Sequence, residues 1–240
     1  MIEFKGVTKK FGQKTAVNKV DFVVNDGELF TILGPNGAGK TTTLKLLTGL
    51  LQPDEGKIFI DGKDIGKEPE VFKSIIGYIP DEPFIYPELS GREFVYFVAR
   101  IYKMDKEEIE HNFEELLKVF NVDEWIDYPS TEYSHGMRQK VIFMQALIHN
   151  PKILVIDEPL VGLDPSSARI IKKTLRSFVK TGNIVVMSTH TLSLAEEISD
   201  RICLIDEGII QGVERMQELL REGFKSLEEA YFSFTGGLND

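Results

Sequence analysis

Two kinds of apolar pattern alternate along this chain. Short, largely apolar runs occupy residues 29–33, 153–157 and 183–188, and such runs are typical of strands buried on both faces of a parallel sheet. Between residues 109 and 120, apolar side chains instead recur at the 3.6-residue spacing of a helix that packs on a core. Strands and helices in this order predict an α/β fold with a helical insertion at residues 90–150.

Turn signals divide the rest of the chain. Residues 1–30 are predicted to be β structure, and Asp61-Gly62 and Glu207-Gly208 mark tight turns between strands. Two amphipathic segments, at 214–222 and 226–234, are expected in the tail. A chain of 240 residues can form a single large domain. We divide it into a core (1–89 and 151–225), the helical insertion (90–150) and a C-terminal tail (226–240).

Composition narrows the functional classes. The net charge of -10 at pH 7 argues against broad binding to nucleic acid, which needs a basic surface. The single cysteine allows no disulfide framework within the chain and fits a reducing compartment. No apolar run approaches the roughly 18 residues of a membrane span, and the first residues lack the layout of a signal peptide. If the protein works at a membrane, we expect another molecule to hold it there.

The most specific motif is Gly34-Pro35-Asn36-Gly37-Ala38-Gly39-Lys40-Thr41, which fits the phosphate-binding P-loop pattern G-x-x-x-x-G-K-[ST]. Its glycines let backbone N–H groups approach phosphate oxygens, and the helix predicted after it directs its positive end at the same anion. Lys40 adds a charge for the β- and γ-phosphates, and the Thr41 hydroxyl suits Mg²⁺. The alternative is a glycine-rich turn that binds nothing, which the apolar strand before it and the helix after it disfavour.

Polar residues follow two other predicted strands. Asp157 and Glu158 come at the end of one strand, where ligands bind in open α/β sheets. We expect Asp157 to hold Mg²⁺, directly or through water, and Glu158 to polarise the attacking water. His190 follows another strand and could donate a hydrogen bond to a γ-phosphate oxygen. The alternatives are a solvated acidic loop and a structural histidine.

Two further sites have more than one interpretation. Ser134 and Gly136 begin the last helix of the insertion, where they either form a nest for an anion or simply cap the helix. Phe11 lies in a polar loop, and its ring could stack on a nucleotide base or fill a gap in the core. Sequence spacing alone does not separate these alternatives.

Together these segments resemble the ATP-binding subunit of an ATP-binding-cassette (ABC) transporter over nearly the whole chain. Residues 34–42 resemble the Walker A motif, 153–158 Walker B with its catalytic glutamate, 162–165 the D-loop, and His190 the switch histidine. The resemblance assigns ATP binding to Phe11, Asn36, Gly37, Ala38, Gly39, Lys40, Thr41, Thr42, Ser134 and Gly136. It implies a P-loop NTPase core with an N-terminal antiparallel β subdomain and an inserted α-helical subdomain, and ATP and Mg²⁺ as cofactors.

Two positions depart from the family pattern. The signature, usually Leu-Ser-Gly-Gly-Gln, is Tyr-Ser-His-Gly-Met at residues 133–137. The imidazole of His135 could crowd a closely approaching phosphate or, when protonated, attract it. Asp81 stands where the family usually has a glutamine that senses Mg²⁺ and the attacking water. We count Asp81 as a catalytic and metal candidate because aspartate can still bind Mg²⁺ or its water, although it adds negative charge near the γ-phosphate.

The resemblance also implies partners. Two subunits would enclose two ATP molecules head to tail, each between one P-loop and the signature helix of the other subunit, so that ATP binding closes the dimer and hydrolysis opens it. Residues 81–90 would pass this motion to a membrane-spanning subunit. We therefore expect an ATPase that powers a transporter, most simply a bacterial-type exporter, at the cytoplasmic face of the cell membrane. It would act as a homodimer or with a paralogue, and without nucleic acid.

Two other classes are alternatives to a transporter subunit. The first is a soluble ABC-type ATPase that remodels a protein assembly, for example in iron–sulfur cluster assembly. The second is a P-loop kinase or GTPase. Neither member of the second class explains the signature helix or His190.

Overall fold

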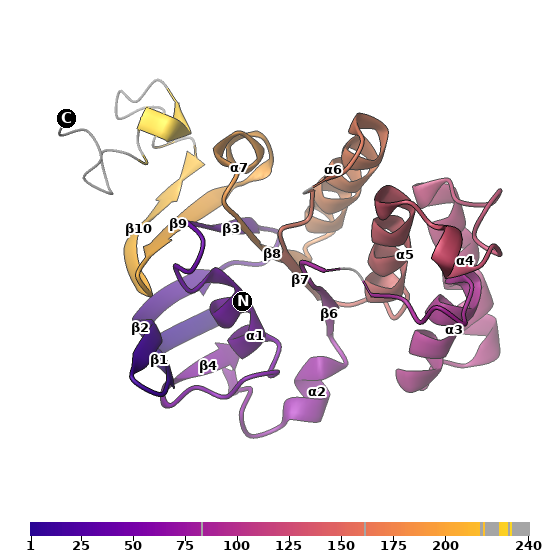
Figure 1. Cartoon of the computed structure of the whole chain (residues 1–240). Helices are drawn as coiled ribbons and strands as arrows, with labels where there is room; N and C mark the ends of the chain where they lie inside the picture. The colour runs from indigo at the N-terminus through magenta and orange to yellow at the C-terminus, as the bar shows by residue number, and fades with distance from the viewer. Residues whose placement is uncertain (83, 161, 217, 219–225, 230, 232–240) are drawn as a thin grey trace.

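The computed structural model describes residues 1–240 except 83, 161, 217, 219–225, 230 and 232–240. Within this part of the chain, strands form two sheets and most helices lie to one side (Figure 1). The elements in chain order are β1 (Ile2–Phe11), β2 (Lys14–Val24), β3 (Leu29–Leu33), α1 (Lys40–Leu47), β4 (Glu55–Ile60), β5 (Lys63–Asp64), α2 (Pro69–Lys73), β6 (Ile76–Ile79), α3 (Gly91–Ile101), α4 (Lys106–Phe120), a 3-10 turn (Ser130–Glu132), α5 (His135–Leu147), β7 (Ile153–Asp157), α6 (Pro165–Lys180), β8 (Ile184–Thr189), α7 (Leu192–Ile198), β9 (Arg201–Asp206) and β10 (Ile209–Arg215).

The two sheets differ in strand direction. Four strands in the order β2-β1-β4-β5 form an antiparallel sheet near the N-terminus. Six strands in the order β10-β9-β3-β8-β7-β6 form the larger sheet, in which only the pairing of β10 with β9 is antiparallel. This arrangement confirms the predicted P-loop core with an N-terminal antiparallel β subdomain.

The buried strand β7 explains why an apolar run without alternation predicts a parallel sheet. Ile153 and Val155 pack in one hydrophobic cluster with the antiparallel sheet and α1, whereas Leu154 and Ile156 pack in a second cluster with α5 and α6. Because successive side chains of a strand point to opposite faces, both faces of β7 must be apolar. The sheet is therefore covered on both sides, and its loops are the parts left open to ligands.

The inserted helical subdomain, formed by α3, α4 and α5, contains the apolar stripe predicted between residues 109 and 120. Ile109, Phe113, Leu117 and Phe120 are all buried on α4, in the same cluster as α3 and α5. The helix is capped by Asp105, whose carboxylate accepts a hydrogen bond from the backbone N–H of Glu108 at 2.8 Å. The stripe is thus core packing, as the sequence predicts.

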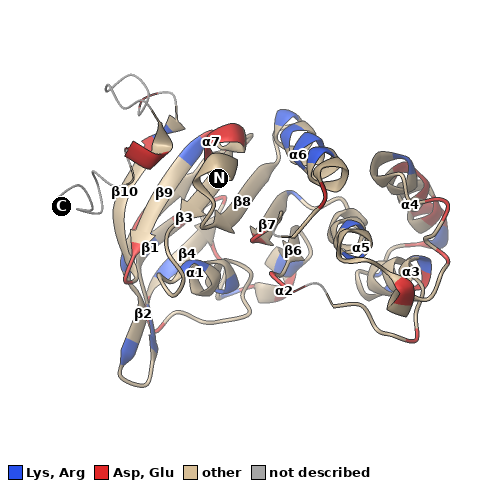
Figure 2. Ribbon diagram, turned by 45° about the horizontal axis from the view of Figure 1, so that its top comes forward, with Lys and Arg blue, Asp and Glu red and all other residues tan. Residues whose placement is uncertain are grey.

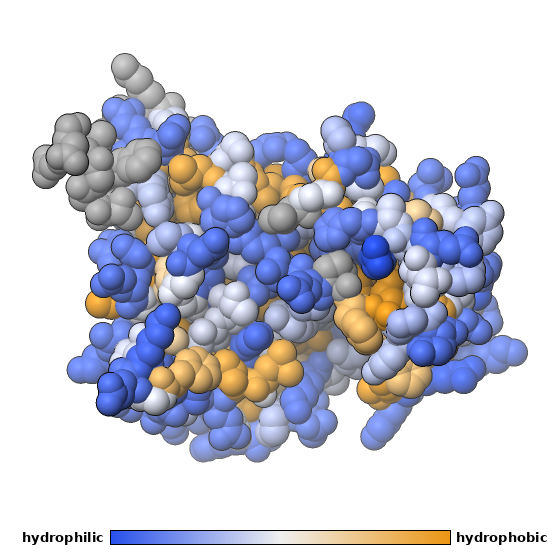
Figure 3. All heavy atoms as spheres, viewed as in Figure 1, coloured by the Kyte–Doolittle hydropathy of each residue, from blue (hydrophilic) through white to orange (hydrophobic). Residues whose placement is uncertain are grey.

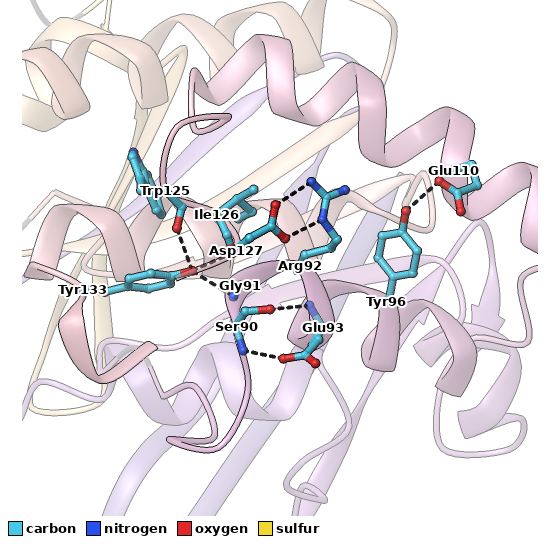
Figure 4. A network of polar contacts seen from close by, with 10 residues as sticks. All are labelled: Ser90, Gly91, Arg92, Glu93, Tyr96, Glu110, Trp125, Ile126, Asp127 and Tyr133. Carbon is cyan, nitrogen blue, oxygen red and sulfur yellow. Dashed lines mark hydrogen bonds and ion pairs between the residues drawn. The ribbon is translucent and has the colours of Figure 1, made fainter. Parts of the chain in front are cut away.

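Hydrogen bonds fix the first turn of α3. The Ser90 hydroxyl accepts from the backbone N–H of Glu93, and the Glu93 carboxylate accepts from the backbone N–H of Ser90, at 3.2 and 2.8 Å (Figure 4). Arg92 donates two hydrogen bonds to the Asp127 carboxylate, at 2.6 and 3.0 Å (Figure 4). These contacts tie the segment after β6 to the loop before α5.

The C-terminal predictions are confirmed only in part. The hairpin about Glu207-Gly208 is present, but its second strand continues to Arg215. The amphipathic segment predicted at 214–222 is therefore wrong at its start, because Glu214 pairs with Ile202 in the sheet. Residues 217, 219–225, 230 and 232–240 of the two predicted tail segments lie outside the described residues. The division of the chain into core, insertion and tail remains our prediction.

Candidate functional site

Adjacent parallel strands bring the predicted site residues to one edge of the larger sheet. β3, β8, β7 and β6 are neighbours, with Leu33 opposite Thr189 and Asp157 opposite Ser188. Each strand ends at this edge, and the P-loop, His190, Glu158 and Asp81 come directly or almost directly after them. Sequence segments far apart in the chain therefore meet where α/β sheets bind ligands.

The P-loop approaches neighbouring backbone so closely that two of its positions fit only glycine. A Cβ at Gly34 would lie 2.1 Å from the carbonyl oxygen of Ile205, and a Cβ at Gly39 would lie 2.3 Å from that of Ala16. Gly39 also has a φ of +107°, which side chains rarely adopt, and it immediately precedes the first residue of α1. The loop is thus packed closely against the backbone of β9 and of β2.

Lys40 is buried at the base of the loop. Its ammonium group donates hydrogen bonds to the carbonyl oxygens of Gly34 at 2.8 Å and Pro35 at 3.1 Å, and it lies 3.8 Å from Oε1 of Glu158. Burial lowers the pKa of Lys40, and the nearby carboxylates of Glu158, Asp157 and Asp81 oppose that shift. A cation is therefore held close to where the motif binds phosphate.

Glu158 is fixed by two neighbours from the end of β8. Its Oε1 lies 2.8 Å from Nδ1 of His190, and its Oε2 accepts a hydrogen bond from the Thr189 hydroxyl at 3.1 Å. Its φ of +48° is in the left-handed region, which is uncommon for a residue with a side chain and recurs at functional sites. The structure thus brings Glu158, His190 and Lys40 together, as the sequence predicts for a shared site.

Asp157 offers an unused acceptor in a buried position. Its Oδ1 accepts a hydrogen bond from the Ser188 hydroxyl, while its Oδ2 is buried without a hydrogen-bond partner. A buried carboxylate oxygen without a partner is costly, and a cation would satisfy it. Among the described residues there is no cluster of three or more His, Cys, Asp or Glu side chains able to hold a metal alone. Any ion here would need further oxygen ligands from nucleotide or water.

A cavity of about 290 Å³ opens beside these groups. Its lining residues are Phe11, Lys14, Ala16, Asn36, Gly37, Gly39, Lys40, Thr41, Thr42, Asp81 and Glu158. Phe11 is 50% exposed at this cavity, so it does not fill a gap in the core. Burial raises the pKa of Asp81, and the carboxylates of Asp157 and Glu158 raise it further. The cavity therefore lies between the phosphate-binding loop and a group of carboxylates whose negative charges repel one another.

Ser134 and Gly136 do not line this cavity within a single chain. The Ser134 hydroxyl caps α5 by accepting from the backbone N–H of Met137 at 3.2 Å, which confirms the capping interpretation without excluding a ligand. A Cβ at Gly136 would lie 3.1 Å from Oδ2 of Asp164, and one at Gly162 would lie 3.5 Å from Cδ2 of His135. The His135 ring thus lies along the D-loop of its own chain.

Some supporting residues escaped the sequence analysis. Thr189 and Ser188 hold the two Walker B carboxylates, and buried Gln139 on α5 donates to the carbonyl oxygen of Pro159 at 3.3 Å. Lys14 of β2 also lines the cavity. Ser188 and Thr189 could have been found from the order of the strands. If β8 is placed next to β7 in a parallel sheet, its last residues lie beside Asp157 and Glu158. Gln139 and Lys14 carried no such signal.

Tyr133 anchors the start of the signature segment and gives a stability prediction. Its buried hydroxyl accepts from the backbone N–H of Gly91 at 2.9 Å and donates to the carbonyl oxygen of Ile126 at 2.8 Å (Figure 4). Tyr133→Phe leaves the N–H of Gly91 without this partner and removes one of the two hydrogen bonds that the Ile126 carbonyl oxygen accepts, the other being from the backbone N–H of Arg92 at 3.2 Å. It should lower the free energy of unfolding by about 1–3 kcal/mol. Urea unfolding measures this loss, with the exposed Tyr128→Phe as the matched control. Equal effects of the two substitutions would contradict the anchoring role.

The fold and this cavity define the class of protein as a P-loop nucleoside triphosphatase. The ABC transporter family matches residues 17–161, and the chain belongs to that family. A relative from Burkholderia lata, "Nod factor export ATP-binding protein I", is 36% identical over 207 residues, which are 86% of this chain and 68% of the relative. The chain is thus an ATP-binding ATPase subunit of the ABC transporter type.

Solved structures agree with this assignment. The ATP-binding subunit of an ABC transporter superposes with a TM-score of 0.90 and 30% identity, over 98% of this chain and 99% of that one. A dimeric ATP-binding cassette in a post-hydrolysis state, bound to ADP and Pi, superposes with a TM-score of 0.82 and 28% identity, over 90% of this chain and 99% of that one. Within the described residues, no helix is both long and apolar enough to cross a bilayer.

Proposed function

We propose that this chain binds ATP with Mg²⁺ in the P-loop cavity and hydrolyses it to drive the closing and opening of a dimer. The observation that carries the proposal is that Lys40 and Glu158 line one cavity and lie 3.8 Å apart, with His190 in contact with Glu158. Lys40 would exchange its contacts with the loop carbonyls for the β- and γ-phosphates. Such an exchange costs little, because the lysine is already desolvated and correctly placed.

Glu158 has the position of a general base in this proposal. With its carboxylate held by His190 and Thr189, it would accept a proton from the water that attacks the γ-phosphate. His190 would then lie beside the γ-phosphate and stabilise charge there. The free Oδ2 of Asp157 and the hydroxyl of Thr41 would hold Mg²⁺, with Asp81 near enough to bind it or its water. The bound ion would offset negative charge on the phosphates.

The signature helix completes the site only if a second subunit supplies it. Ser134 and Gly136 lie outside the cavity of their own chain, at the positive end of α5. We infer that they face the γ-phosphate bound by the other subunit, either a second copy or a paralogue. Because His135 lies against Gly162 of its own chain, its ring would be turned away from that phosphate. Crowding by the imidazole is then avoided.

A membrane-spanning subunit is the partner we propose for the surface next to Asp81. Phe84 is 63% exposed and its ring meets that of Tyr86 at 5.4 Å, while Tyr86 meets Phe97 of α3 at 6.1 Å. Figure 3 shows apolar side chains gathered where the segment between β6 and α3 crosses this face. Exposed aromatic patches mark interaction surfaces. The relative named for export favours an exporter, with this chain at the cytoplasmic face of the membrane.

The mass of Glu158→Gln in solution tests the composite site. In this variant the base is lost while the carboxamide keeps its size, so bound ATP should persist and hold two chains together. Light scattering should show a monomer without nucleotide and a dimer with Mg-ATP. Glu158→Gln combined with Lys40→Ala is the control and should stay monomeric. A monomer that demonstrably binds ATP would refute closure of a homodimer.

A copurification experiment separates a transporter subunit from the alternative of a soluble remodelling ATPase. An affinity-tagged chain expressed from its native locus should copurify with a membrane-spanning protein after detergent extraction. Phe84→Ser and Tyr86→Ser together should lose that protein while ATP hydrolysis continues, because both rings lie outside the nucleotide cavity. Recovery of the chain only in the fraction without membranes would favour the remodelling class.

A further inference from the structure

A second cavity lies away from the nucleotide site. It has a volume of about 630 Å³, within the usual range for small-molecule sites, and none of its lining residues lines the P-loop cavity. Its walls come from α4 and the end of α5 on one side and from α6 and the start of β8 on the other. An occupant would therefore contact the helical subdomain and the core at the same time.

The floor of this cavity is apolar. Leu116 and Val119 of α4 line it together with Ile170 and Phe178 of α6, and Leu147 of α5 is a further apolar lining residue. Val119 is 48% exposed, and Leu116, Ile170 and Phe178 are partly buried against the main hydrophobic cluster. An open apolar floor of this kind gains free energy when a hydrocarbon covers it.

The rim of the cavity carries positive charge that is not neutralised. Lys118 and Lys173 line it and form no ion pair with any described residue. Of the other charged groups at the rim, Lys152 pairs with Asp61 at 2.7 Å. Glu115 also lines the cavity and lies 3.7 Å from Nε2 of His111, a contact that is an ion pair only when His111 is protonated. Two free ammonium groups beside an apolar floor favour an anionic head on an apolar body.

The helix that supplies one wall has an unusual charge for this acidic chain. α6 carries five basic residues and no acidic one, whereas the net charge of the chain is -10 (Figure 2). Lys172 and Arg176 are paired with Glu197 and Asp200 of the α7 region, at 2.7 and 2.8 Å. Lys173 points instead to the cavity side of α6, so the positive potential of this helix is partly available to a ligand.

We propose that the cavity between α4 and α6 is a binding site for a small amphipathic anion, a straight acyl chain that ends in a carboxylate. The acyl chain covers the apolar floor between Leu116 and Phe178. The carboxylate accepts hydrogen bonds from Lys118 and Lys173 at the rim. This site is separate from ATP binding, so its test does not depend on hydrolysis or dimer formation.

Calorimetric titration with octanoate and with 1-octanol tests the proposal. Octanoate should bind the full chain saturably, with a Kd of about 0.1–1 mM, and 1-octanol more weakly. Lys118→Gln combined with Lys173→Gln should weaken octanoate about 5- to 10-fold and leave 1-octanol unchanged, because only the charge is removed. Lys180→Gln, on the same helix but outside the cavity, is the matched control and should change neither affinity.

A second substitution tests the location. Ser177 is exposed on the wall of the cavity, so Ser177→Trp should fold normally and block both ligands by occupying the floor. Thermal unfolding followed by circular dichroism verifies that each variant is folded. Absence of saturable octanoate binding to the unaltered chain would overturn the proposal. Unchanged octanoate binding in the double lysine variant or in Ser177→Trp would overturn it as well.

Discussion

Glu158→Gln is expected to lower kcat for ATP hydrolysis by about 100- to 1000-fold while the affinity for ATP stays within a factor of about three. The carboxylate lies at the end of β7 with one oxygen on His190 and the other on Thr189, so a single orientation is available to receive a proton. General bases of this kind contribute about 10²- to 10⁴-fold to rates. The amide keeps the shape and both neighbours but cannot accept the proton.

Steady-state phosphate release measures the rate, and direct titration with ATP measures the affinity. Glu196→Gln is the matched control, since Glu196 is exposed on α7 and lies outside the nucleotide cavity. Thr189→Ala should have an intermediate effect, because it removes one of the two contacts that orient Glu158. Hydrolysis at the parent rate by Glu158→Gln would remove Glu158 from its proposed role.

The sequence predicted which residues meet at this edge of the sheet because parallel strands have a simple geometry. Once 153–157 and 183–188 are buried parallel strands, the residues after them must lie at one edge, next to the loop that follows 29–33. Lys40, Glu158 and His190 are brought together in this way. The roles of Glu158 and Lys40 in ATP hydrolysis are proposals that Glu158→Gln and Lys40→Ala would test.

The direction of the His135 side chain could not be predicted from the sequence. The pattern at 133–137 left His135 either crowding a phosphate or attracting it, because the choice depends on which neighbour its ring meets. The D-loop supplies that neighbour through Gly162, which has a φ of +73° and no side chain to exclude the ring. In the same way, the strand β10 extends to Arg215 because Glu214 finds a partner in β9. Local amphipathicity had predicted that a separate tail segment starts there, and strand pairing overrode it.

Lys40→Ala is expected to weaken ATP binding by about 10- to 100-fold. The ammonium group is buried at the base of the P-loop, and hydrogen bonds to charged groups contribute about 1.5–3 kcal/mol. The fold should survive, because the substitution removes a buried charge, and water in the cavity can replace the contacts to the carbonyl oxygens of Gly34 and Pro35. Lys45→Ala is the matched control, since Lys45 is exposed on the same helix.

A series of nucleotides separates the proposed contact from a general defect in the site. Lys40 is assigned to the β- and γ-phosphates, so Lys40→Ala should weaken ATP and ADP binding but leave AMP binding within about twofold. A displaced P-loop would instead weaken all three nucleotides, because the backbone N–H groups and the helix end act on every phosphate. An equal loss for AMP and ATP would therefore show that Lys40 acts by shaping the loop. Loss confined to ATP and ADP would establish it as a phosphate ligand.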